Sequence, residues 1–184
     1  MDAGASISND HTGETLTMLI SNEARQLYRV LLPPGRPSPP LHYHVKFTET
    51  FKVIEGSLDL YLGRERKLLA LNAGDSFTVP IGRPHTFANY RATASLISVE
   101  SNPAGTVAEA FQLAYAVANE GGASKDGLPK NILLRLLFIR ISQGFIPGIP
   151  LVFQQAVLSA AFFLSEISGL KRYLVRHNIH LEFK

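Results

Sequence analysis

From Glu14 to Glu100 the apolar residues fall in short runs of four to seven, separated by Pro, Gly and Asn or Asp. Helices need apolar positions three or four residues apart over longer stretches, whereas short runs between turn residues are typical of strands. Eight or nine strands of this length favour a closed or double-sheet barrel. We expect strands at residues 15–20, 25–32, 41–45, 49–56, 57–63, 67–71, 75–80, 85–90 and 94–100.

Two glycine junctions lie inside this region. Glu55–Gly56 and Leu62–Gly63 each follow a strand-like run. Glycine adopts the positive φ that tight hairpins need, so both junctions predict hairpin turns.

After residues 101–105 the composition changes to Ala, Leu, Ile, Phe and Gln, with few turn residues before Gly121. This change predicts a helical segment. We expect helices at residues 106–120, 130–142 and 150–168. The chain is therefore expected to have three parts, which are a flexible leader at 1–13, a mainly β barrel at 14–105, and a helical C-terminal extension at 106–184 packed on the barrel or at a subunit interface.

The composition limits the possible chemistry and partners. The chain has no cysteine, so a metal could be held only by histidine and carboxylate side chains. Up to Pro103 ten Lys and Arg balance ten Asp and Glu, and from Ala104 onward there are eight against five. No basic cluster with interleaved aromatic residues accompanies the barrel, which argues against nucleic-acid binding. The first ten residues lack the basic start and apolar run of a secretion signal, so we expect a cytoplasmic protein.

Residues 141–165 contain no charged side chain. Glycine and proline at 144–150 interrupt this stretch and leave about sixteen helical residues, too few for a bilayer span. A buried or subunit-interface helix is the favoured interpretation, and we expect a homodimer. The alternative is peripheral contact with a membrane surface, assisted by nearby basic residues. These are Arg135, Arg140, Lys171, Arg172 and Arg176.

Two histidines and a glutamate lie close together in "LHYHVKFTETFKVIEG", residues 41–56. In a strand His42 and His44 project to the same face. Glu49 has the wrong parity for that strand, but a turn in the intervening residues can bring it back from the neighbouring strand. His85 begins a further strand, and its imidazole could join those of His42 and His44 and the Glu49 carboxylate.

These motifs resemble those of the cupin superfamily. The second cupin motif, "GDSFTVPIGRPHTFAN" at residues 74–89, is present with every spacing. At background frequencies of about 7% Gly and about 5% Pro, its Gly–Pro–Gly frame alone would arise in roughly a few windows per ten thousand. The first motif, "GRPSPPLHYHVKFTETFKVIEG" at residues 35–56, has six residues instead of five between Gly35 and His42. The resemblance covers about residues 14–105 and implies a double-stranded β-helix, the jelly-roll barrel.

By this resemblance His42, His44, Glu49 and His85 would be the four ligands of one divalent transition metal. Three imidazoles and a carboxylate suit Fe, Mn, Ni, Co, Cu or Zn and leave positions open for water, oxygen or substrate. Glu49 would also be the candidate proton acceptor. The identity of the metal is not defined by these residues.

Strand parity predicts an apolar wall beside this site. Phe51 and Val53 follow Glu49 into the barrel, and Phe87 follows His85. Such a pocket would suit a small organic molecule, although ordinary core residues show the same pattern. We expect the Tyr43 side chain to pack in the protein and Asn89 to form a hydrogen bond at a strand end. The remaining histidines are expected to lie outside the site, and these are His11, His177 and His180.

The resemblance implies a metal-dependent enzyme, most like the cupin dioxygenases that include flavonol (quercetin) dioxygenases. One alternative is a cupin sugar isomerase or epimerase, which would need cationic residues inside the barrel for a phosphorylated sugar. The other is a non-catalytic module that binds a metal or ligand, since the fold alone does not define an activity.

Overall fold

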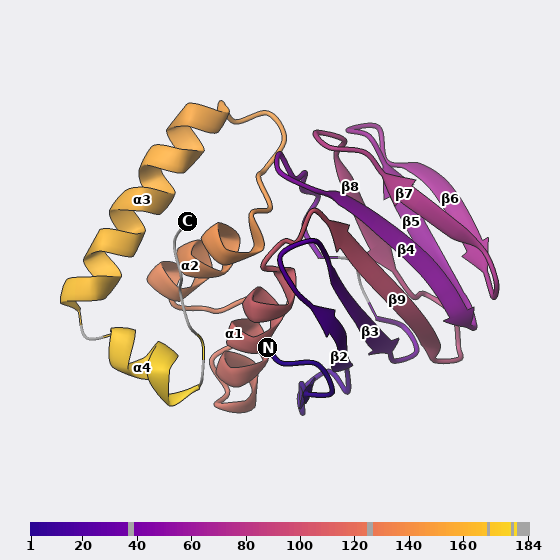
Figure 1. Cartoon of the computed structure of the whole chain (residues 1–184), viewed down its shortest axis with the longest axis horizontal. Helices are drawn as coiled ribbons and strands as arrows, with labels where there is room; N and C mark the ends of the chain where they lie inside the picture. Colours follow the sequence, from indigo (N-terminus) through magenta and orange to yellow (C-terminus); the bar gives the residue numbers. More distant parts are fainter. Residues whose placement is uncertain (37–38, 125–126, 169, 178, 180–184) are drawn as a thin grey trace.

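The computed structural model of the chain describes residues 1–36, 39–124, 127–168, 170–177 and 179. The strands gather on one side of the molecule and the helices on the other (Figure 1). The chain thus forms a β-sandwich followed by C-terminal helices, which confirms the expected fold class.

The strands form two antiparallel sheets. One has six strands in the order β1-β2-β3-β9-β4-β7, and the other has three in the order β6-β5-β8. The first sheet comprises β1 (Ser6–Ser8), β2 (Thr15–Ser21), β3 (Gln26–Leu32), β9 (Ser95–Asn102), β4 (Thr48–Glu55) and β7 (Ser76–Val79). The second comprises β6 (Lys67–Asn72), β5 (Ser57–Leu62) and β8 (His85–Ala88).

The core lies between the two sheets. In β5 the side chains of Leu58, Leu60 and Leu62 are buried and pack with Val30 and Ile97 from the larger sheet. Burying an aliphatic side chain of this size contributes about 1.5–3 kcal/mol to folding. The alternating pattern of the sequence therefore corresponds to the faces that hold the sandwich together.

Residues 41–45, predicted as a strand, do not form one. Backbone pairing in this segment is limited to two isolated bridges, His42 with His85 and Tyr43 with Phe145. Because one partner is the start of β8 and the other follows α2, no single neighbouring strand runs beside the segment. The prediction of a regular strand was therefore wrong, and the two bridges connect the segment to the start of β8 and to the residues after α2.

Two further predictions need correction. Residues 6–8, within the stretch expected to be a flexible leader, form β1 and pair with β2. The Glu55–Gly56 junction is not a hairpin, because β4 and β5 belong to different sheets. Gly56 has φ of 77°, and a Cβ there would lie 2.8 Å from the Ala94 carbonyl oxygen, so glycine allows the chain to cross between sheets in a confined space. The Leu62–Gly63 junction does connect the antiparallel pair β5 and β6.

The extension contains α1 (Val107–Asn119), α2 (Ile132–Ser142), α3 (Leu151–Ile167) and α4 (Leu170–Arg176). The first three confirm the predicted helices to within about two residues, and α4 was not predicted. Asn131 starts α2 by accepting hydrogen bonds from the backbone N–H groups of Leu133 and Leu134. Among the described helices, none is both long enough and apolar enough to span a bilayer.

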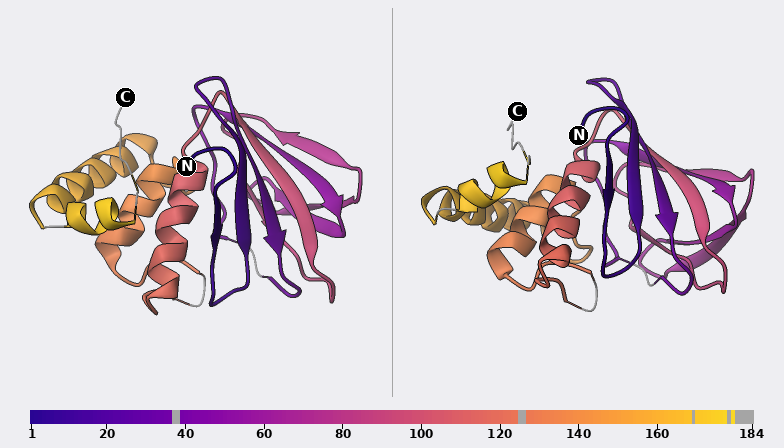
Figure 2. Two further views of the ribbon diagram at one scale, coloured as in Figure 1. Left: turned by 60° about the horizontal axis from the view of Figure 1, so that its bottom comes forward. Right: turned by 90° about the horizontal axis from the view of Figure 1, so that it is seen from below.

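The helices cover the barrel in layers. Val107, Ala108 and Tyr115 of α1 belong to the same hydrophobic core as the strands. A second core joins α1, α2 and α4 and includes Leu137 of α2 and Leu174 of α4. Both views in Figure 2 show α1 beside the sheet and α3 farther away. The beginning of the extension is thus part of the barrel structure, whereas α3 packs mainly on other helices.

Candidate metal centre

The four side chains expected to bind metal meet at one place. One possible ligand atom from each of His42, His44, Glu49 and His85 lies within 4.8 Å of the others. His44, Glu49 and His85 are buried, and His42 is half-buried. Residues far apart in the chain therefore form a single cluster of three imidazoles and one carboxylate.

Glu49 and His85 come from opposite sheets. Glu49 lies in β4 between Val79 of β7 and Ser101 of β9. His85 is the first residue of β8, in the smaller sheet. Both side chains point into the sandwich, so their contact joins the two sheets at one end.

The other two candidate ligands, His42 and His44, come from the 41–45 segment. His42 exchanges two backbone hydrogen bonds with His85, at N···O distances of 3.1 and 2.8 Å. The carbonyl of His44 accepts a hydrogen bond from Gly82 N–H at 2.7 Å. These bonds hold the two imidazoles beside the start of β8 without a regular strand.

Each imidazole is oriented by a backbone carbonyl. A carbonyl oxygen only accepts hydrogen bonds, so the bonded Nδ1 must carry the proton, and Nε2 of the neutral ring has a free lone pair. Metal-binding histidines typically have this arrangement. The Nδ1···O pairs are His42 with Pro40 at 2.9 Å, His44 with Gln143 at 3.0 Å and His85 with Arg83 at 3.0 Å.

The histidine Nε2 atoms and the Glu49 carboxylate face one another at the centre of the cluster, and this arrangement favours a cation between them. Glu49 Oε2 lies 2.9 Å from His85 Nε2 and 3.4 Å from His44 Nε2. Among the described residues, buried His44 Nε2 has no hydrogen-bond partner. With all three rings neutral, only lone pairs would face the carboxylate, which is unfavourable in a buried site. A proton or a metal ion removes this repulsion.

Electrostatics favour the ligand forms of these groups. Burial alone would raise the pKa of the Glu49 carboxyl, but the electrostatic interactions of this carboxylate with His44 and His85 outweigh burial and hold that pKa well below its usual range. Burial, with His85 and His44 nearby, lowers the pKa of His42 from 6.5 to about 3. At neutral pH the site thus contains an ionised carboxylate and a neutral His42.

This cluster fits a transition metal. Nitrogen and oxygen ligands bind a transition metal at about 2.0–2.2 Å, so two ligand atoms of one ion lie at most roughly 4.4 Å apart. The candidate ligand atoms of the four residues all lie within 4.8 Å of one another, which is close to that limit. The donor set of three nitrogens and one carboxylate oxygen suits several divalent ions equally. His42, His44, Glu49 and His85 could therefore hold a metal ion whose identity is unknown.

Comparison with known families agrees with this geometry. A family model described as a cupin domain matches residues 28–100, which contain all four of these side chains. This region is a cupin domain. No curated protein matched the chain.

Solved structures also resemble the cupin domain. An RmlC-like cupin from Shewanella frigidimarina is 22% identical with a TM-score of 0.45, over 52% of this chain and 81% of that one. The polyketide cyclase RemF from Streptomyces resistomycificus is 23% identical with a TM-score of 0.44, and the match covers 49% of this chain and 65% of the cyclase. A sugar phosphate isomerase of the cupin superfamily from Silicibacter pomeroyi is 26% identical with a TM-score of 0.43, and the match covers 49% of this chain and 59% of the isomerase.

The helical extension closes one side of the cupin site. The carbonyl that orients His44 belongs to Gln143, the residue that ends α2. Tyr43 and Phe145 exchange two backbone hydrogen bonds of 2.9 Å. A Cβ at Gly144 would lie 3.3 Å from the His42 ring, so this backbone lies directly beside a candidate ligand. The site is thus built from both the cupin domain and the extension.

A cavity of about 210 Å³ lies between the cluster and the helices. His42, His44 and Glu49 line it, together with residues of α1 and α2. Of the three residues predicted to form a substrate pocket, Phe87 lines the cavity. Phe51 and Val53 are not among the lining residues and lie in the hydrophobic core. Their inward direction was predicted correctly, but strand parity does not give depth along the barrel.

The remaining predicted residues have local roles. Asn89 donates to the carbonyls of Leu32, Pro33 and Thr93, as expected for a residue that hydrogen-bonds at a strand end. The Tyr43 ring packs near Phe145 at a centroid distance of 5.9 Å. His11 is exposed, His177 contacts Glu120 at 3.1 Å, and the His180 prediction lies outside the described residues.

Sequence reasoning missed the contribution of the extension. Phe111 and Tyr115 of α1 and Phe138 of α2 line the cavity. In sequence they belong to an apolar helical pattern that also describes ordinary core residues. No local motif indicates that these helices return to the barrel opening.

Proposed function

We propose that the protein is a metal-dependent enzyme acting on a small organic molecule, with dioxygenase chemistry related to that of the cupin flavonol dioxygenases. The supporting observation is that three imidazoles and Glu49 converge where the barrel meets a mainly apolar cavity. A bound divalent metal would supply a Lewis acid, and if redox-active it would also support reaction with O₂. Dioxygenation places both atoms of one O₂ molecule in the organic product, so no separate reductant is required.

The protein side chains have distinct roles in this proposal. His42, His44 and His85 present Nε2 to the metal, and backbone carbonyls fix their tautomers. Glu49 contributes one carboxylate oxygen as ligand, and its other oxygen is the proposed acceptor for the proton of an enol or phenol. The apolar walls exclude water from the reacting carbon.

A sugar-phosphate isomerase is the second enzyme candidate, and charge in the cavity argues against it. Arg36 Nε lies 2.9 Å from Glu14 Oε1, so this cation is already balanced by a carboxylate. Arg135 donates to the Pro129 carbonyl and to Ser124 Oγ. Both cavity-lining arginines are thus engaged within the protein, whereas a phosphate would need available cationic donors.

A non-catalytic binding module is the third candidate, and one experiment separates all three. Elemental analysis of the purified protein is followed by oxygen-electrode measurements with a panel of phenols, enols and flavonols. We expect close to one Fe, Mn, Ni, Co or Cu per chain and substrate-dependent O₂ uptake. Zn without O₂ uptake would favour isomerisation or binding, and a protein that contains and takes up no metal would contradict the metal-dependent proposal.

We also propose a cytoplasmic location and a homodimeric assembly. The dimer is supported by the helical extension, whose apolar helices exceed what a small barrel needs to cover itself. Fractionation and light scattering test these two proposals separately.

A further inference from the structure

The connection between α2 and α3, residues 143–150, is in direct contact with the candidate metal centre. Its first residue supplies the carbonyl that orients His44. Phe145 exchanges two backbone hydrogen bonds with Tyr43, the residue between His42 and His44. The position of this connection therefore affects how both histidines face the site.

The backbone of the connection borders two hollow regions. Gly144 and Ile146 line the cavity of about 210 Å³ that the candidate ligands also line. Gln143 and Phe145 line a second, larger cleft between the barrel and the helices, with a volume of about 810 Å³. A segment with little packed around it opens more readily than one inside a core. The connection therefore needs other contacts to hold it in place.

The side chain of Gln154 supplies such contacts. Its Oε1 accepts a hydrogen bond from the Ile146 N–H at 2.8 Å. Its Nε2 donates to the carbonyls of Ile146 and Ile149, at 3.1 and 2.9 Å. Gln154 is buried, with 7% of the residue exposed, whereas the adjacent Gln155 is exposed. One side-chain amide thus ties both backbone groups of Ile146 to α3.

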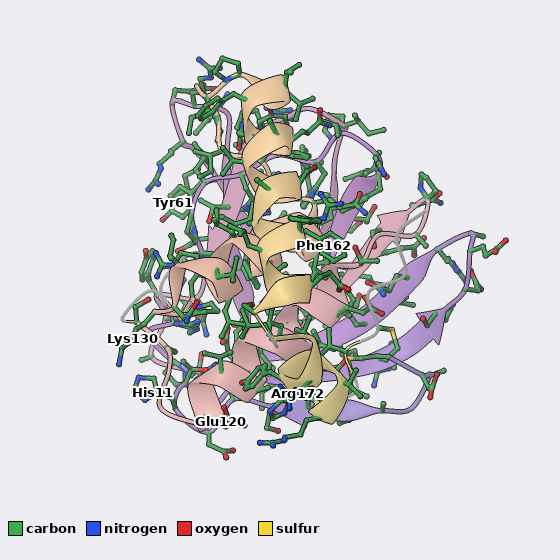
Figure 3. All side chains as sticks on the ribbon, turned by 90° about the vertical axis from the view of Figure 1, so that its left-hand side faces the viewer. His11, Tyr61, Glu120, Lys130, Phe162 and Arg172 are labelled. Carbon is green, nitrogen blue, oxygen red and sulfur yellow. The ribbon has the colours of Figure 1, made fainter. Side chains whose placement is uncertain are left out.

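α3 is itself anchored on α2, the helix at the other end of the connection. Gln154 lies in the first turn of α3. Farther along α3, Ser159 Oγ accepts a hydrogen bond from Arg140 of α2 at 3.2 Å. The guanidinium of Arg140 also lies 5.1 Å from the centre of the Phe162 ring, which is labelled in Figure 3. A tie to α3 therefore fixes the connection relative to α2 and to the cavity wall that α2 forms.

We propose that Gln154 is a positioning residue for the candidate metal centre. By tying residues 146–149 to α3, it keeps the Gln143 carbonyl and the Phe145 backbone where they orient His44 and its neighbours. This inference rests on the proposed function for the metal-binding role of the cluster. It adds that metal binding and the docking of α3 on the connection are linked, so that each favours the other.

The Zn²⁺ affinity of the full chain tests the link to the metal. Competition with a chromophoric chelator compares the wild type with Gln154→Met, in which a thioether side chain of similar length replaces the amide. Ile146 and Ile149 are 41% and 39% exposed, so water can reach the released turn and the variant should fold. We expect Gln154→Met to lose about tenfold in affinity, the lower end of the roughly 10–100-fold caused by losing a ligand's own supporting hydrogen bond.

Hydrogen exchange in the metal-free protein tests the Gln154 contacts themselves. The Tyr43 and Phe145 amides should exchange at least about tenfold faster in Gln154→Met, while the amides of β3 and β9 keep wild-type rates. This pattern separates a local opening at the site from a general loss of stability. Unchanged exchange at Tyr43 and Phe145, or faster exchange together with wild-type Zn²⁺ affinity, would overturn the proposal.

Two further variants complete the test. Gln155→Met, at the exposed neighbour that lines the larger cleft, is the matched control and should stay within about twofold of the wild type in both measurements. Should Gln154→Met fail to fold, Gln154→Glu retains the acceptor for the Ile146 N–H, loses both donations, and should show the same two changes. A wild-type protein that bound no Zn²⁺ would contradict the proposed function, whereas the exchange measurement needs no metal and still decides whether Gln154 holds the connection.

Discussion

The Nδ1–H of His44 donates to the carbonyl oxygen of Gln143 over 3.0 Å, which connects a candidate metal ligand of the cupin domain to a residue 99 positions later. Gln143 has φ of 52° and ψ of 28°, the left-handed conformation that often ends a helix. This conformation turns the chain after α2 toward the 41–45 segment. The extension is therefore directly involved in orienting a ligand.

This contact predicts that the Gln143 backbone, and not its side chain, supports the site. Gln143→Gly retains the carbonyl and relieves the left-handed conformation, which disfavours non-glycine residues by roughly 1 kcal/mol. We expect unchanged metal affinity within about threefold and a melting temperature equal to or above that of the wild type. A loss of metal affinity similar to that of a ligand variant would contradict this assignment.

Removing a candidate ligand should have a different result. His44→Ala is expected to eliminate stoichiometric metal binding, with a loss larger than the roughly 10–100-fold caused by losing a ligand's supporting hydrogen bond. Circular dichroism should show a largely folded barrel. His11→Ala, at an exposed histidine, is the control. One metal ion per chain in dialysed His44→Ala protein would show that the ligand set is wrong.

The metal-free protein should lose stability in acid. Burial lowers the pKa of His42 to about 3 in the folded protein, against 6.5 when unperturbed, and the Glu49 pKa is also lowered. The unfolded chain therefore binds more protons than the folded chain from about pH 6.5 downward, so stability falls as pH falls. A difference of one proton corresponds to about 1.4 kcal/mol per pH unit.

Denaturant unfolding of the metal-free protein between pH 7 and pH 4 measures this slope. His42→Gln removes one of the titrating groups and should reduce the slope. A stability that is constant, or that rises, as the pH is lowered through this range would contradict the charge states assigned to the cluster.

Local sequence patterns predicted the sandwich, and the resemblance to the cupin motifs implied that the four side chains converge. Strand parity placed Glu49, Phe51 and Val53 of β4 on the buried face, and the spacing of the second motif placed His85 at the start of a strand. These features follow local rules, because alternation and turn residues are encoded over a few positions. The prediction was wrong at 41–45, where pairing depends on two distant partners.

The role of the extension could not be predicted for the same reason. Tyr115 and Phe138 occur in apolar helical patterns, and such patterns indicate burial without naming the surface that a helix covers. Only the tertiary structure shows that α1 and α2 return to the barrel opening. Long-range packing therefore determines the cavity, whereas short motifs determine the candidate ligands.

The homodimer remains a prediction that α3 makes testable. Val152, Phe153, Phe163 and Leu164 of this helix are exposed, and Figure 3 views the molecule from this side. Multi-angle light scattering should give twice the chain mass of 20.2 kDa. Phe163→Glu then tests whether α3 forms the contact, since a buried carboxylate would favour the monomer. A monomer mass for the wild type at micromolar concentration would contradict the prediction.

The close approach of Gly144 to His42 gives the most local test of how the extension shapes the metal centre. A Cβ at this position would lie 3.2 Å from Ser142 Oγ and 3.3 Å from the Cδ2 atom of His42. Alanine requires its neighbours to move slightly, whereas the branched side chain of valine would displace the imidazole.

We expect metal affinity to decrease about 10–100-fold in Gly144→Val, as when a ligand loses its orientation, and much less in Gly144→Ala. Competition with a chromophoric chelator measures both affinities, and thermal unfolding of the metal-free proteins checks the fold. Wild-type affinity in a folded Gly144→Val protein would mean that His42 tolerates displacement, and that the extension does not set the position of this ligand.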